Sequence, residues 1–219
     1  MAPGHMIPML DIAKLFSHFG VQTTFISTFG NAPLVETSIN HFNSTNSSNP
    51  SIKLVLIQFP SAEAGLPVGC ENASYLTSID MLVSFHKAVA MLRQHFDQLL
   101  EQLLPDAVFS DYFLPWTLDS AYIVMLFNTW TFAVCAAYNV DHYDPHSRPE
   151  ESFIVPDLPH PIHILKSQVH NLLKTDPRIM KIMLAADESD EKSYGAVMNS
   201  FYELEPDYVD YYRNVCCKM

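Results

Sequence analysis

Apolar residues recur along this chain with two different periods, which predict alternating helices and strands. Residues 8–20 carry apolar side chains on most sides of a helix that can begin at Pro8 and end at Gly20. Residues 21–28 form a β-branched run typical of a strand, and residues 52–59 are almost continuously apolar, as is a strand covered on both faces. Because helices alternate with such strands, the pattern predicts an α/β fold built on a parallel sheet.

The rest of the chain continues this alternation. The further predicted strands are residues 107–110, 123–127 and 194–201. The further predicted helices are residues 33–40, 75–104, 116–121, 128–138, 165–174, 177–188 and 205–213. Two polar or aperiodic stretches, residues 41–51 and 60–74, are expected to be loops, and the second is long for a connection, which is typical of a functional loop.

The composition is that of an ordinary globular protein. With 219 residues, 48% hydrophobic and 16% charged, the chain can bury the core of one large domain or two small ones. The excess of 24 acidic over 12 basic residues would repel a phosphate backbone or an anionic membrane, so nucleic-acid binding is disfavoured. No secretory signal and no apolar run of roughly 18 residues occurs, and the expected location is the cytoplasm.

The cysteines and histidines lack the spacing of metal or redox sites. The four cysteines are expected to be reduced thiols; they are Cys70, Cys135, Cys216 and Cys217. Two histidine pairs occur in the stretch 141–163, but prolines interrupt their spacers and no cysteine or carboxylate completes a ligand set. We therefore expect no metal. Three glycosylation sequons, at Asn43, Asn46 and Asn72, are expected to be accidents of polar loops.

His5 is a candidate general base. It directly precedes the predicted helix, where the positive end of the helix dipole favours neutral imidazole, the form that can accept a proton. The alternative is a solvated histidine near the start of the chain, with no chemical role.

Asp111 follows the predicted strand 107–110 and is a candidate partner for His5. Ligand sites of open α/β sheets lie beyond the carboxyl ends of strands, so Asp111 is expected on the same rim as His5. A carboxylate beside an imidazole fixes its tautomer and stabilises the imidazolium that forms when it takes a proton. The alternative is that Asp111 only caps the helix over residues 116–121 or binds loop amides.

Four blocks of the sequence carry a family resemblance. They are residues 2–16, with Gly4-His5, and residues 59–71, 105–121 and 193–208. In this order they resemble the N-terminal, acceptor-binding half of plant family-1 UDP-dependent glycosyltransferases, in particular those acting on flavonoids, coumarins and triterpenoid saponins.

The resemblance implies a fold, a reaction and site residues. Such enzymes place two Rossmann-like domains across a cleft, the GT-B arrangement, and transfer a sugar from a UDP-sugar with inversion. The histidine of the Gly-His motif deprotonates the acceptor hydroxyl and an aspartate at a strand end orients it, which assigns these roles to His5 and Asp111. Phe113 and Thr129 fall near positions that line the acceptor pocket or touch the sugar.

The resemblance also sets expectations for the chain as a whole. Residues 1–219 would be an incomplete acceptor-binding domain, a Rossmann-like parallel sheet with helices on both faces and its first central strand missing. The C-terminal UDP-sugar-binding domain would be absent, so this polypeptide alone is expected to be inactive. The expected partners are a small hydrophobic hydroxylated acceptor and, as co-substrate rather than cofactor, a UDP-sugar. The alternative is a non-catalytic remnant or a small-molecule-binding protein.

Overall fold

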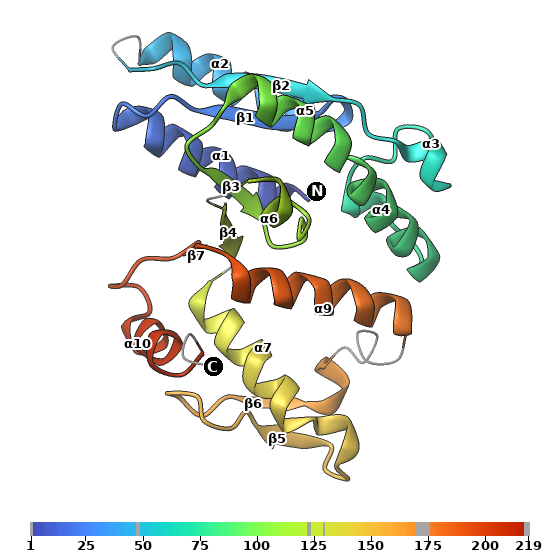
Figure 1. Ribbon diagram of the computed structural model, residues 1–219. Helices are drawn as coiled ribbons and strands as arrows, with labels where there is room; N and C mark the ends of the chain where they lie inside the picture. Colours follow the sequence, from blue (N-terminus) through green and yellow to red (C-terminus); the bar gives the residue numbers. More distant parts are fainter. Residues whose placement is uncertain (1, 47–48, 122–123, 129, 170–175, 217–219) are drawn as a thin grey trace. The chain divides into compact units, whose positions relative to one another are not determined.

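The computed structural model describes residues 2–46, 49–121, 124–128, 130–169 and 176–216 (Figure 1). The chain divides into two compact units. The first comprises Met1–Val108 and Trp116–Tyr122, and the second Phe109–Pro115 and Ile123–Met219. Both contain parallel strands and helices, which confirms the predicted α/β class.

The first unit begins with a helix, followed by two parallel strands that two further helices connect. These elements are α1 (Pro3–His18), β1 (Thr24–Thr28), η1 (Phe29–Leu34), α2 (Glu36–Thr45) and β2 (Lys53–Ile57). β1 pairs with β2 in parallel, with Thr24 opposite Lys53. Apolar residues of α1, β1 and α2, together with one residue directly before α2 and one directly before β2, form the core of the unit; they are Met6, Leu10, Ala13, Phe25, Val35, Ile39 and Ile52.

The remaining helices of the first unit are α3 (Ser61–Ala64), η2 (Ala73–Tyr75), α4 (Ile79–Met91), α5 (Arg93–Leu103) and α6 (Thr117–Ser120). The single helix predicted over 75–104 is therefore two helices. α4 begins after Ser78, whose hydroxyl accepts the Met81 N–H at 3.2 Å. Buried Leu92 separates α4 from α5, because its N–H bonds three residues back to Val89 and tightens the turn.

The second unit contains a sheet of order β3-β4-β7, in which β4 and β7 are parallel. Its strands are β3 (Val108–Asp111), β4 (Val124–Asn128) and β7 (Gly195–Met198), and its long helices are α7 (Thr131–Tyr143), α9 (Pro177–Lys192) and α10 (Pro206–Asn214). α7 and α10 pack together, with the rings of Phe132 and Tyr208 5.0 Å apart (Figure 1).

One part of this unit differs from the sequence-based expectation. Residues 152–165 form an antiparallel pair, β5 (Ser152–Ile154) with β6 (His163–Leu165), flanked by the short helices η3 (Pro145–Ser147) and η4 (Lys166–Gln168). The helix predicted over 165–174 is wrong for residues 165–169, and residues 170–175 lie outside the described part. Strands of three residues are too short to show a period, so the pairing left no signal in the sequence.

Candidate functional site

His5 lies inside the first turn of α1, because the helix begins at Pro3 and not at Pro8 as predicted. Pro3 occupies the first helical turn, where a missing N–H costs nothing, and Ala2 precedes it in an extended conformation. The His5 N–H donates to the Ala2 carbonyl at 3.0 Å, and the side chain is half-buried. The imidazole therefore still lies at the positive end of a helix of 16 residues.

The buried face of α1 fixes the backbone that carries His5. Met6, directly after it, is 6% exposed and belongs to the core of the first unit, as do Leu10 and Ala13. At the other end of the helix the fully buried Ser17 hydroxyl donates to the Pro50 carbonyl. Buried contacts near both ends therefore hold the helix that carries His5.

Asp111 is the last residue of β3 and organises the turn that follows. Its Oδ1 accepts the Phe113 N–H at 2.9 Å, and its carbonyl accepts the Leu114 N–H at 2.9 Å. The loop-amide role that the sequence left open is therefore present. A carboxylate has two oxygens and about four acceptor positions, so this role is compatible with a histidine partner. His5 and Asp111 belong to different compact units, and their pairing stays a prediction.

Of the other two predicted site residues, the structure describes Phe113. Phe113 is brought next to Asp111 by the hydrogen bond just described, is half-buried, and meets Tyr112 edge to face at 5.1 Å. Thr129 lies outside the described residues. Both remain predicted acceptor-pocket or sugar-contact positions.

The turn after β3 is tied to α9 by a tyrosine that the sequence analysis did not single out. The Tyr112 hydroxyl donates to the Asp187 carboxylate, and burial together with that carboxylate raises the pKa of Tyr112. Burial and the charges of Asp187 and Glu191 also raise the pKa of Asp190. Tyr112 therefore stays protonated at neutral pH and holds the segment that carries Asp111 and Phe113 against the helix.

Glu205 is a second residue that the sequence analysis missed. Its buried carboxylate accepts the N–H groups of Thr131 and Phe132, each at 2.8 Å, and so caps α7 where that helix follows β4. Burial opposes ionisation, but hydrogen bonds to the carboxylate outweigh it, so the pKa of Glu205 is lowered. A cap that lies 74 residues from its helix has no spacing signature in the sequence.

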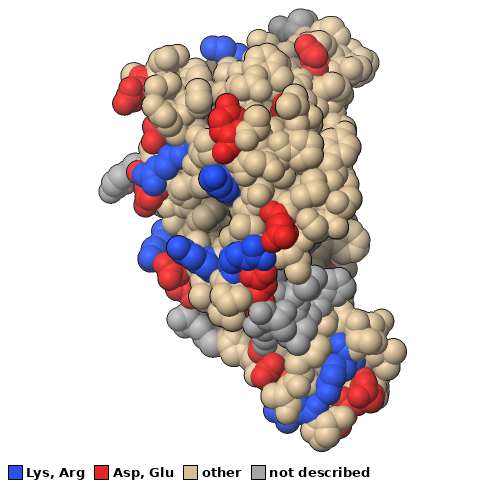
Figure 2. All heavy atoms as spheres, turned by 90° about the vertical axis from the view of Figure 1, so that its right-hand side faces the viewer, with Lys and Arg blue, Asp and Glu red and all other residues tan. Residues whose placement is uncertain are grey.

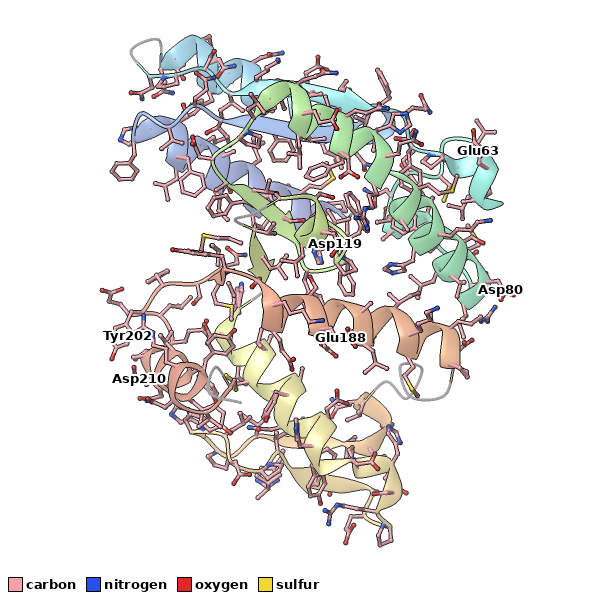
Figure 3. All side chains as sticks on the ribbon, viewed as in Figure 1. Glu63, Asp80, Asp119, Glu188, Tyr202 and Asp210 are labelled. Atoms are coloured by element: carbon pink, nitrogen blue, oxygen red, sulfur yellow. The ribbon has the colours of Figure 1, made fainter. Side chains whose placement is uncertain are left out.

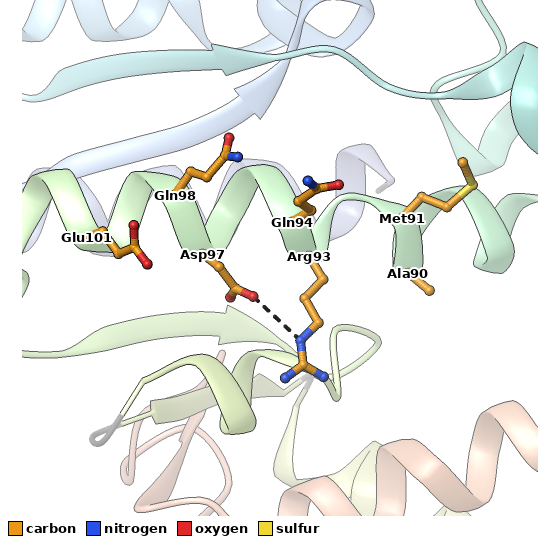
Figure 4. Close-up of a pocket in the computed structure, with 7 residues that line it drawn as sticks. All are labelled: Ala90, Met91, Arg93, Gln94, Asp97, Gln98 and Glu101. Atoms are coloured by element: carbon orange, nitrogen blue, oxygen red, sulfur yellow. Dashed lines mark ion pairs between the residues drawn. The ribbon is translucent and has the colours of Figure 1, made fainter.

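A surface hollow of about 540 Å³ runs along α4 and α5 (Figure 4). Arg93 links this hollow to α6. Its Nε lies 3.7 Å from Asp97 Oδ2, the pair drawn in Figure 4, and its Nη1 lies 2.9 Å from Asp119 Oδ2. The Arg93 and Asp97 side chains are 43% and 42% exposed. Five of the seven residues that line the hollow are polar or charged, and none of the predicted site residues is among them; the lining consists of Ala90, Met91, Arg93, Gln94, Asp97, Gln98 and Glu101. It is therefore unlike a pocket for a hydrophobic acceptor.

Acidic and basic side chains lie interspersed on the face shown in Figure 2, in a chain with a formal net charge of −12. Among the residues that the structure describes, no three His, Cys, Asp or Glu side chains gather as a metal site. The same residues include no helix that is both long enough and apolar enough to cross a membrane.

Two curated proteins similar to this chain are named glucosyltransferases. No protein-family model matches the sequence. A UDP-glucose flavonoid 3-O-glucosyltransferase of Fragaria ananassa is 43% identical over 98% of this chain and 44% of its own length. A scopoletin glucosyltransferase of Nicotiana tabacum is 41% identical over 98% of this chain and 47% of its own length. The chain thus spans less than half the length of these relatives.

The fold agrees with these sequence relationships. The crystal structure of Glycyrrhiza uralensis UGT73P12, solved with glycyrrhetinic acid 3-O-monoglucuronide, superposes with a TM-score of 0.84 at 31% identity. The match covers 98% of this chain and 45% of that one. Arabidopsis thaliana UGT89C1, solved with UDP-L-rhamnose, has the same fold with a TM-score of 0.64. The chain is therefore similar, in sequence and in fold, to the N-terminal part of plant UDP-glycosyltransferases, and it matches less than half of each of these proteins.

Proposed function

We propose that this chain is the acceptor-binding part of a plant UDP-glycosyltransferase. The complete enzyme would transfer a sugar from a UDP-sugar to a hydroxyl of a small hydrophobic plant metabolite, a triterpenoid, flavonoid or coumarin. The observation that carries the proposal is the 43% identity, over 98% of the chain, to an enzyme named for UDP-glucose and a flavonoid. The cytoplasmic location expected from the sequence stays a prediction.

In the proposed reaction His5 acts as the general base. Neutral imidazole takes the proton of the acceptor hydroxyl while the hydroxyl oxygen attacks the anomeric carbon of the sugar. The bond from that carbon to UDP breaks, UDP leaves with the bonding electrons, and the configuration inverts. Asp111 orients the imidazole and stabilises the imidazolium, and the position of His5 at a helix N-terminus favours the neutral starting form.

The acceptor and the sugar donor have separate requirements. Phe113 and Thr129 would fall near positions that line the acceptor pocket or touch the sugar. The UDP-sugar is a co-substrate, and the part of the relatives that binds it would be the part beyond the match to this chain. No cofactor or metal is required for the proton transfer or the displacement.

The alternative function, kept from the sequence, is that of a non-catalytic remnant or small-molecule-binding protein that transfers no sugar. The two functions share acceptor binding and differ in catalysis.

The test measures binding and transfer separately. Titration of the 219-residue chain with the flavonol quercetin and the coumarin scopoletin, followed by tryptophan fluorescence and calorimetry, should show saturable 1:1 binding. Incubation of the same protein with UDP-glucose and either acceptor, followed by mass spectrometry, asks whether glucoside forms. A triterpenoid aglycone is titrated in the same way. If none of the three compounds binds, the proposed acceptor-binding role is contradicted.

A further inference from the structure

A buried polar network joins two segments that follow β1 and β2 in the first unit. The four residues that contribute side chains to this network are almost inaccessible to solvent: Thr28 is 0% exposed, Asn31 1%, Asn72 5% and Glu71 6%. Glu71 is ionisable, and burying a carboxylate is costly unless hydrogen bonds compensate it. The groups that bond to the Glu71 side chain therefore show what this residue does.

The hydrogen bonds of the network run between η1 and the long segment after β2. Glu71 Oε2 accepts the Gly30 N–H at 2.7 Å, and the Glu71 carbonyl accepts from Asn31 Nδ2 at 2.8 Å. Asn31 Nδ2 also donates to Thr28 Oγ1 at 2.9 Å, and Asn72 Nδ2 donates to Asn31 Oδ1 at 2.8 Å. Residues about 40 positions apart in sequence are therefore fixed to each other by directional bonds.

Gly30 makes this geometry possible. A Cβ added to Gly30 would lie 2.7 Å from Glu71 Cδ and 2.9 Å from Oε2, closer than side-chain atoms approach one another. The carboxylate thus packs directly against the backbone, and only glycine leaves room for it. The contact can be broken from either side, by changing Glu71 or by adding a methyl group at Gly30.

The location of the network connects it to ligand binding. Both joined segments leave the carboxyl ends of parallel strands, the edge of an α/β sheet where ligands bind. The same two segments carry large apolar side chains that remain exposed: Phe29 is 56% exposed, Tyr75 62% and Val68 92%. The network therefore fixes the backbone beneath apolar side chains that solvent, or an apolar ligand, can reach.

We propose that Glu71 is a positioning residue for the acceptor: its carboxylate couples residues 29–34 to residues 66–75, so that the apolar side chains of the two segments form one fixed surface. The inference rests on the proposed function, because it assigns that surface to the hydrophobic acceptor. This positioning role differs from a purely stabilising one. Apolar side chains of similar volume would stabilise the fold at least as well as a buried carboxylate does.

The first measurement is amide hydrogen exchange of the 219-residue chain, resolved by mass spectrometry. In Glu71→Ala the exchange of residues 29–34 and 66–75 should accelerate together, by about tenfold or more, while the β1 and β2 amides keep their protection. Glu71→Gln retains an oxygen that can accept the Gly30 N–H, so it should lie between Ala and wild type. Gly30→Ala should reproduce the Glu71→Ala pattern. Glu63→Gln is the matched control, since Glu63 is exposed on α3 in the same connection (Figure 3).

The second measurement is the Kd of quercetin, which should rise about tenfold in Glu71→Ala and Gly30→Ala, less in Glu71→Gln, and not in Glu63→Gln. Acceleration of only one segment, or of the strands as much as the segments, would overturn the coupling. Coupled acceleration with an unchanged Kd would overturn the assignment to the acceptor. If the wild type itself does not bind quercetin, the proposed flavonol binding fails and the acceptor assignment falls with it, whereas the exchange data still decide whether Glu71 couples the segments.

Discussion

At the scale of single residues, the structure shows which change at Asp111 can test its predicted pairing with His5. Asp111 uses Oδ1 to accept the Phe113 N–H, so its replacement by Asn, with its amide oxygen toward that N–H, keeps the turn and removes the charge. Changes at Asp111 can thus test its electrostatic role without unfolding its loop. Replacement of Asp111 by Ala would remove the charge and the hydrogen bond that holds the turn at the same time.

The corresponding prediction concerns an enzyme in which this chain is joined to a UDP-sugar-binding domain. His5→Ala should lower kcat by roughly 10²–10⁴-fold, since the base is lost. Asp111→Asn should also lower kcat substantially, and the double variant should be little worse than His5→Ala alone because the two groups act as one unit. Steady-state kinetics measure this, with His18→Ala, an exposed histidine at the other end of α1, as control.

Two results would contradict this assignment. Full activity in His5→Ala would remove the general base. Effects that multiply in the double variant, with all proteins folded, would mean that Asp111 acts only through its own turn.

Cys135 provides a second prediction at this scale. Burial, aided by the neighbouring Cys216, raises the pKa of the Cys135 thiol to about 12, and the residue is 0% exposed. Only about one part in 10⁴ would be thiolate at pH 8, so iodoacetamide should not modify Cys135 in the folded chain. Peptide mass spectrometry should find the half-buried Cys216 labelled first and Cys135 labelled only in urea. Equal labelling rates of the two cysteines in the native protein would contradict the buried thiol.

At the scale of elements, hydrophobic periodicity predicted the ends of β1, β2, β3, β4 and β7 to within three residues. The helices were predicted less closely: α2 and α7 end five residues later than predicted, and the helix predicted over 165–174 is wrong for residues 165–169. Periodicity failed where a tertiary contact overrides local composition. Residues 41–45 are rich in Asn, Ser and Thr and were expected to be a loop, yet α2 extends to Thr45. Phe42 packs on the core there, and Asn43 exchanges hydrogen bonds of 3.0 and 2.9 Å with the backbone of Ile52.

The sequons illustrate the same point about context. The amide nitrogen of Asn43 donates to the Ile52 carbonyl, and Asn72 is 5% exposed within the Glu71 network. Neither nitrogen is available for a glycan in the folded chain. Spacing alone identifies an acceptor sequence, but burial decides whether it can be used.

The cap of α7 gives the prediction at the scale of elements. Glu205→Gln should lower the free energy of unfolding by about 2 kcal/mol at pH 7, because two N–H groups at a helix N-terminus lose a charged acceptor. The folded-state pKa of Glu205 is depressed, so its contribution is complete above the unfolded pKa of about 4.3 and is lost as the pH falls through the folded value. The difference between wild type and Glu205→Gln should therefore shrink below about pH 4.

Urea unfolding at pH 7 and at lower pH measures this difference. Glu203→Gln, an exposed glutamate two residues away, is the control and should change stability by less than about 0.5 kcal/mol. A Glu205→Gln deficit that stays constant as the pH falls would show that the charge is not the source of the stabilisation.

At the scale of the whole molecule, the site was less predictable than the fold. The sequence predicted His5 near a helix start and Asp111 at a strand end, and residue chemistry and a family resemblance both suggested their roles, which stay predictions. It could not locate the carboxylates of Glu71 and Glu205, which bond to backbone groups 41 and 73–74 residues away. Such contacts have no fixed spacing, because they depend on how separate elements pack.

The last prediction concerns transfer by the chain with and without a donor-binding partner. Holding two substrates in the correct geometry can supply roughly 7–11 kcal/mol of a reaction barrier, and this requires sites for both. The chain matches 44% of the strawberry enzyme, so the 219 residues alone should bind quercetin but form no glucoside from UDP-glucose. Fusion to the remaining C-terminal part of that enzyme should restore glucoside formation, detected by mass spectrometry. The same fusion with His5→Ala should bind quercetin with unchanged Kd and lose transfer. Glucoside formed by the unfused chain would place a donor site within these 219 residues. It would contradict the proposal that this chain binds the acceptor and another part of the enzyme binds the UDP-sugar.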